Sequence, residues 1–192
     1  MVNNKSLTIN EVFNLAVKNH QEGKIDIAQE HYNQVLKINP NHSQALNNLG
    51  IIFKGLGENQ KAKDCYEKAI EINPNYTNAH NNLGVIFQKL SDLQKAKECF
   101  EKVIEIDPNY VNAHNNLGNI LEELGEFQKA KEYFEKVIEI DPNCANAQDK
   151  LGYLLERELE HERVLSEIEK AQKSKNKNKI NFIKKIRKKI FG

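Results

Sequence analysis

The sequence contains no tryptophan, only three cysteines and only four prolines among its 192 residues. So few cysteines, in an odd number, do not suggest a disulfide framework. No apolar run approaches the ~18 residues that a membrane-spanning helix needs. The polar start of the chain, residues 1–10, also lacks the apolar core of a signal peptide. These absences predict a cytoplasmic protein without transmembrane helices.

Negative charge is missing from the end of the chain. Residues 173–192 contain eight lysines and Arg187 but no acidic residue. Because the whole chain has a net charge of +1, residues 1–172 carry −8. An acidic body would repel phosphates, and the basic tail has a single arginine, so no nucleic-acid partner is expected.

The prolines recur at a fixed spacing. They lie 34 residues apart, each after an Asn or Asp, at Pro40, Pro74, Pro108 and Pro142. The letters between them repeat too, with NNLG at 47–50, 81–84 and 115–118, and QKAK at 60–63, 94–97 and 128–131. A constant period of this length is typical of a repeat protein.

Each period reads as two antiparallel helices. In residues 77–110 the apolar spacing is helical twice, first through His80, Leu83, Gly84 and Phe87 and then through Ala96, Phe100, Val103 and Ile104. Asp92 is placed to cap the second helix, and the proline ends it, since proline lacks an N–H and restricts the preceding residue. A small residue recurs in the first helix, where it lets the partner helix approach closely, at Ala16, Gly50, Gly84, Gly118 and Gly152.

These units resemble the tetratricopeptide repeat in its 34-residue form. The family's pattern of small, aromatic and proline positions falls on Leu83, Gly84, Phe87, Ala96, Phe100, Val103 and Pro108, and on their equivalents in the other units. The family's usual first-helix tryptophan is replaced by Val12, Leu46, His80 and His114. The resemblance implies an all-α, right-handed superhelical solenoid of antiparallel helix pairs.

The expected organisation follows the period. A lead-in at 1–8 precedes four repeats at 9–42, 43–76, 77–110 and 111–144, a degenerate fifth repeat or capping helices at 145–172, and a basic amphipathic tail at 173–192. The segment 145–172 lacks the turn glycine and closing proline, so one longer continuous helix is the competing interpretation. An end repeat needs a polar outer face, which this segment has.

The candidate binding site is a row of amides on the first helices, expected to line the concave groove. The sixth position of the units reads Asn14, Asn48, Asn82 and Asn116, and the second position adds Gln44, Asn78 and Asn112. An asparagine offers both a donor and an acceptor, so the row could pair with the backbone of an extended peptide. A similar ladder holds peptides in the O-linked N-acetylglucosamine transferase family. Alternatively, the same asparagines only pack or solvate the groove.

Two related expectations concern the groove's surroundings. The fifth-position residues Asn47, Asn81 and Asn115 are expected on the convex edge or in solvent. A clamp for a terminal carboxylate is disfavoured, because Lys54 and Lys89 are the only basic residues at the twelfth and thirteenth positions of the central units.

The tail reads as a linker followed by a basic amphipathic helix. Its docking residues are predicted to be Ile183, Lys184, Lys185, Ile186, Lys188 and Lys189. Three uses stay open: contact with an anionic membrane or a protein partner, packing on the end of the solenoid, or a solvated tail.

No catalytic, metal-binding or cofactor-binding residues are predicted. His80 and His114 share one repeat position and read as packing residues, while Cys65 and Cys99 share another and read as core. No Cys/His spacing fits a zinc site, and there is no glycine-rich phosphate loop.

The leading hypothesis is a non-catalytic scaffold that binds an extended peptide or partner helix in its groove. One alternative is an accessory recognition arm acting in trans with a glycosyltransferase-type or other enzyme. The other is a membrane-surface adaptor anchored by the tail. The sequence leaves the oligomeric state open.

Overall fold

A computed structural model describes residues 7–173, 181–185 and 187–188. Nine helices span residues 9–173: α1 (Ile9–Gln21), α2 (Ile25–Ile38), α3 (Ser43–Gly55), α4 (Asn59–Ile72), α5 (Thr77–Lys89), α6 (Leu93–Ile106), α7 (Val111–Glu123), α8 (Phe127–Ile140) and α9 (Ala145–Lys173). The described tail residues are also helical, and no strand occurs in the described part of the chain. The chain divides into unit 1, through Ile120, and unit 2, from Leu121.

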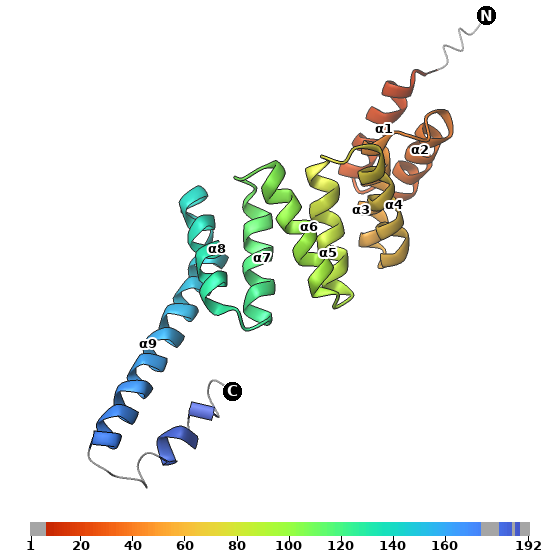
Figure 1. Ribbon diagram of the computed structural model, residues 1–192. Helices are drawn as coiled ribbons and strands as arrows, with labels where there is room; N and C mark the ends of the chain where they lie inside the picture. The colour runs from red at the N-terminus through yellow and green to blue at the C-terminus, as the bar shows by residue number, and fades with distance from the viewer. Residues whose placement is uncertain (1–6, 174–180, 186, 189–192) are drawn as a thin grey trace, which may run out of the picture. The chain divides into compact units, whose positions relative to one another are not determined.

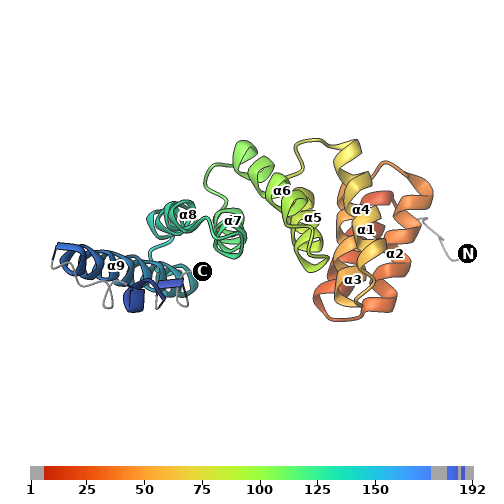
Figure 2. The same ribbon diagram turned by 60° about the horizontal axis from the view of Figure 1, so that its bottom comes forward.

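In unit 1, consecutive helices pack side by side as pairs (Figure 1). α1 packs on α2, α3 on α4 and α5 on α6, while α2 meets α3 and α4 meets α5. The first helices α3 and α5 also touch each other. Figure 2 shows the same pairs from a second direction. The helix pairs predicted from the 34-residue period are therefore present.

The helix starts depend on local capping. Thr8 and Glu11 form a capping box at α1, in which the Glu11 amide donates to Thr8 Oγ1 at 3.3 Å and the Thr8 amide donates to Glu11 Oε2 at 2.7 Å. Asp92 accepts the Lys95 amide at 3.3 Å, which confirms it as the cap of α6.

The Asn/Asp-Pro pairs end the second helices as predicted. Asn39, Asn73, Asp107 and Asp141 each adopt an extended conformation directly after α2, α4, α6 and α8. Their side chains have a role that the sequence analysis missed. In each of the four turns the side-chain oxygen accepts the backbone amide two residues further on, as Asn39 does from Asn41 at 3.0 Å. This local bond favours Asn or Asp at that position.

The recurring glycines of the first helices let aromatic rings of the second helices approach. A Cβ added at Gly50 would lie 2.6 Å from Tyr66 Cε1, and one at Gly84 would lie 2.7 Å from Phe100 Cε1. Both rings are fully buried. Close packing therefore outweighs the low helix propensity of glycine at these two positions.

The first helices are buried on a wider face than predicted. Besides Leu49 and Gly50, α3 buries Ala45 and Ile52. Both belong to a cluster with Tyr32 of α2, the second helix of the preceding pair. A first helix thus packs against two second helices, and the apolar pattern of one isolated pair shows only part of this contact.

Unit 2 corrects the expectation of a fifth helix pair. Residues 145–173 form one continuous helix, α9, which is the competing interpretation of this segment. No glycine or proline stands where the turn of a repeat would be, and the run of Glu, Leu and Arg there favours helix. Gly152 keeps the repeat pattern, yet a Cβ added there would meet nothing within 4 Å.

Candidate functional site

The predicted asparagine row is a hydrogen-bonded network in unit 1. Asn48 Nδ2 donates to the Tyr32 hydroxyl at 3.1 Å, and Asn82 Nδ2 donates to Asn47 Oδ1 at 3.1 Å. Asn47 in turn donates to Asn48 Oδ1 at 3.2 Å. The network therefore joins α2, α3 and α5.

Asn47 corrects one expectation. It was expected at the convex edge or in solvent, but only 3% of its surface is exposed. Its carboxamide fills the space between α3 and α5, where it holds the sixth-position asparagines of both helices. Because a buried amide is costly unless it is hydrogen-bonded, these contacts explain how an asparagine is tolerated there. Asn81, at the same repeat position, is half-buried.

Asn48 and Asn82 keep part of their bonding capacity. An asparagine side chain has two N–H groups and an oxygen with two lone pairs. Asn48 uses one N–H and one lone pair within the network. Asn82 does the same, with Lys54 Nζ at 3.5 Å from its oxygen. Both side chains are half-buried, so solvent reaches them.

The other predicted groove residues are exposed or half-buried. Asn14 is exposed on α1 and Asn116 is half-buried on α7. The second-position residues Gln44, Asn78 and Asn112 are all exposed. Asn78 Oδ1 accepts the Tyr110 hydroxyl at 3.1 Å, which ties α5 to the turn that follows α6.

Two lysines lie near this network. Burial lowers the pKa of Lys54, and the charge of Lys89 lowers it further. Lys54 and Lys89 come from the ends of α3 and α5, and Lys54 Nζ lies 3.5 Å from Asn82 Oδ1. This part of unit 1 is therefore polar with a positive region.

The tail residues fall into three groups. Ile183 is 9% exposed and packs with Val164 and Ile168 of α9. The predicted docking lysines Lys184, Lys185 and Lys188 are exposed, while Ile186 and Lys189 lie outside the described residues. Among the described tail residues, Ile183 thus packs on α9, while the three uses of the tail as a whole stay predictions.

Two histidines and two cysteines of unit 1 lie in environments that point to a structural role. His80 Nε2 donates to the Pro74 carbonyl at 2.9 Å, and His114 Nε2 donates to the Pro108 carbonyl at 2.8 Å. Burial raises the pKa of the Cys65 thiol to about 11 and that of Cys99 to about 12. These thiols are poor nucleophiles at neutral pH.

The described residues contain no group of three or more His, Cys, Asp or Glu side chains that could hold a metal ion. Nor, in the same part of the chain, is any helix long and apolar enough to cross a membrane.

Comparison with known proteins identifies the repeats. Residues 43–76, 77–110 and 111–144 match a sequence model described as tetratricopeptide repeat, and residues 13–42 match a second model with that description. The matched segments cover more than half of the chain. A comparison with curated proteins finds no match.

Solved structures share the fold. A crystal structure of MamA is 26% identical, with a TM-score of 0.71, and the alignment covers 89% of this chain and 94% of that one. The pilF protein of Pseudomonas aeruginosa is 19% identical, with a TM-score of 0.72 and coverage of 95% and 91%. YrrB, described as having an unusual peptide-binding site, is 21% identical, with a TM-score of 0.69 and coverage of 93% and 92%. These likenesses confirm the predicted fold class, an all-α solenoid of antiparallel helix pairs.

Proposed function

The chain belongs to the tetratricopeptide repeat family, and on this premise we propose that it is a non-catalytic protein-interaction scaffold. Its ligand is an extended peptide segment of a partner protein, held along the first helices by Asn14, Asn48, Asn82 and Asn116. The observation that supports this proposal best is the network around Asn47. It fixes two of these asparagines while leaving each a free donor and acceptor.

A fixed amide favours binding. A side chain already held by its neighbours loses little conformational freedom when a ligand arrives, so more of the interaction energy is available for affinity. Backbone groups occur in every peptide, so such a row selects extended conformation more than side-chain sequence. Specificity then depends on neighbouring groups such as Lys54 and Lys89.

The test uses peptides selected from a random library displayed on phage, measured by fluorescence anisotropy. The variant replaces Asn14, Asn48, Asn82 and Asn116 with alanine. A matched control replaces four exposed polar residues of the second helices with alanine, at Asn33, Gln34, Gln60 and Gln94. Circular dichroism and urea unfolding establish that both variants fold.

Groove binding predicts that only the first variant loses affinity, by at least about tenfold. Peptides with methylated backbone nitrogens should also bind more weakly, because methylation removes the N–H that an asparagine oxygen accepts. If the folded groove variant binds as tightly as the wild type, the asparagines are structural and the proposal is wrong.

A further inference from the structure

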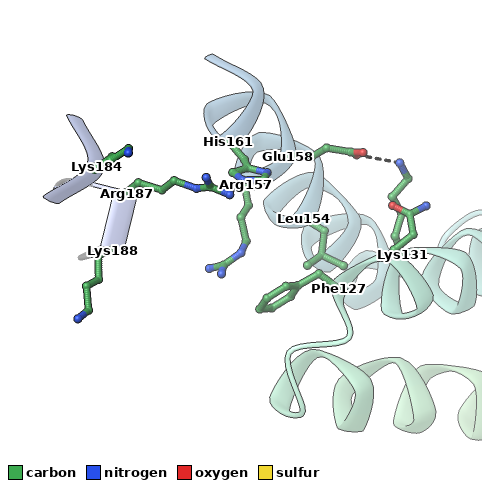
Figure 3. A pocket seen from close by; sticks show the side chains of 10 residues that line it. Phe127, Lys131, Leu154, Arg157, Glu158, His161, Lys184, Arg187 and Lys188 are labelled. Atoms are coloured by element: carbon green, nitrogen blue, oxygen red, sulfur yellow. Dashed lines mark hydrogen bonds and ion pairs between the residues drawn. The ribbon is translucent and has the colours of Figure 1, made fainter. Parts of the chain in front are cut away.

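Unit 2 contains a cleft whose lining residues all follow the asparagine row in the sequence. It has a volume of about 710 Å³ and is lined by the start of α8, the middle of α9 and the tail residues 184–188 that are described (Figure 3). This is within the ~300–1,000 Å³ range of ligand pockets. We call it the basic cleft.

The charge of the basic cleft is opposite to that of the body. Five lining residues are lysines or arginines, at Lys131, Arg157, Lys184, Arg187 and Lys188, against one carboxylate, Glu158. Glu158 Oε2 already pairs with Lys131 Nζ at 2.9 Å. The tail adds three cations, Lys184, Arg187 and Lys188, to this concave surface of a chain whose residues 1–172 carry −8.

Contacts between the tail and α9 form one wall of the cleft. Ile183 packs on Val164 and Ile168. Arg187 Nη2 donates to His161 Nε2 at 3.1 Å. Because arginine is always protonated and only donates, that ring nitrogen of His161 is the acceptor. The tail cations are therefore placed on α9 by one apolar and one polar contact.

The opposite wall combines a cation with apolar surface. The Arg157 guanidinium lies over the Phe127 ring, 4.0 Å from its centroid. In Figure 3, Arg157 extends from α9 toward the space between Phe127 and the tail. Leu154 adds a buried aliphatic side chain beside them. This wall suits a ligand with both a negative group and an apolar group.

We propose that the basic cleft binds an acidic segment of a partner protein. Carboxylates of that segment pair with the tail cations Lys184 and Lys188, and a neighbouring apolar side chain packs on Phe127 and Leu154. The site is separate from the asparagine row, so the two can be tested independently.

Two observations favour a protein segment over an anionic membrane. The cations surround a hollow that a flat surface does not fill, whereas a peptide can enter it. Ile183 is used in packing on α9, which removes an apolar residue from the face that would enter a bilayer.

The experiment measures binding of a fluorescein-labelled peptide of Glu and Asp with two leucines to the full chain. The cleft variant carries Lys184→Glu and Lys188→Glu. The matched control carries Lys170→Glu and Lys173→Glu, which change the net charge equally at exposed residues outside the cleft lining. A peptide with Gln and Asn in place of the acids tests the charge requirement.

The expected result is that the acidic peptide binds the wild type and the control within about twofold, while the cleft variant loses about tenfold or more. Affinity should fall as salt rises, and the neutral peptide should not bind. The asparagine variant described above should bind the acidic peptide normally. That result would separate this site from the proposed groove.

Three outcomes would overturn the proposal. The first is failure of the acidic peptide to bind the wild type at all or to distinguish the two charge variants, since in either case the cleft does not recognise it. The second is cleft-dependent binding to vesicles of phosphatidylcholine and phosphatidylserine without peptide binding, which would assign the cleft to a membrane. The third is concentration-dependent self-association in sedimentation velocity that only the cleft variant loses, which would make the occupant a second copy of this chain.

Discussion

Gly84 and Gly152 occupy the same repeat position in different surroundings, which makes a sharp test of the packing. A Cβ at Gly84 would lie 2.7 Å from Phe100 Cε1, while one at Gly152 would meet nothing within 4 Å. Replacing either glycine with alanine improves helix propensity by about 1 kcal/mol. Only Gly84→Ala also overpacks the core, which costs about 1–3 kcal/mol.

Gly152→Ala should therefore raise the free energy of unfolding by about 1 kcal/mol. Gly84→Ala should give a value about 1–3 kcal/mol below that of Gly152→Ala, because the shared propensity gain cancels in the comparison. The measurement is urea unfolding followed by circular dichroism at the helix band, with the slope of the transition checked for each variant.

The ring itself can be tested by a double-mutant cycle. In a Phe100→Leu background the ring atoms nearest Gly84 are gone, so Gly84→Ala should cost less than in the wild type, with a coupling of about 1 kcal/mol or more. If Gly84→Ala stabilises the protein as much as Gly152→Ala does, the close approach of α5 and α6 is not what selects glycine there.

Three further predictions follow from single contacts. Thr8→Ala removes the capping box of α1 and should lower the free energy of unfolding by about 1 kcal/mol, measured by urea titration. Tyr66→Phe should be neutral or stabilising in the same assay, because the buried Tyr66 hydroxyl has no hydrogen-bond partner among the described residues. Iodoacetamide should alkylate Cys144 faster than Cys65 and Cys99 at pH 8. Burial raises the pKa of Cys65 to about 11 and that of Cys99 to about 12, so the alkylation rate of these two thiols should rise as the pH approaches those values. Equal alkylation rates for all three thiols at pH 8 would contradict the burial of Cys65 and Cys99.

The fold could be predicted because the 34-residue pattern occurs four times in the sequence. A proline after Asn or Asp every 34 residues marks each helix end, and Asn39 and its equivalents adopt the extended conformation that this requires. The local signal and the tertiary structure agree at these turns. Residues whose burial depends on a neighbouring pair were harder to place. Ala45 and Ile52 contact the second helix of the preceding pair, which the pattern of one pair does not reveal.

The candidate site could be predicted only in part. The asparagine row was evident from its spacing, yet the role of Asn47 depends on how closely α3 approaches α5, and no local pattern gives that distance. The tail was predicted as an amphipathic helix, but the packing of Ile183 on Val164 and Ile168 joins residues about 15 to 19 positions apart, which a helical period does not reveal. The basic cleft was missed altogether, because its cations come from three separate segments.

The continuous helix α9 has a mechanical consequence. At 1.5 Å per residue its 29 residues extend about 43 Å, whereas the 14 residues of α8 extend only about 21 Å. About half of α9 therefore extends beyond its contact with α8. A bend of about 10° near Arg157, where α9 passes the start of α8 at Phe127, would displace the end of α9 by about 4 Å. A ligand that contacts both α8 and the tail across this point would limit this bending. Binding would therefore reduce the motion of the C-terminal end of α9.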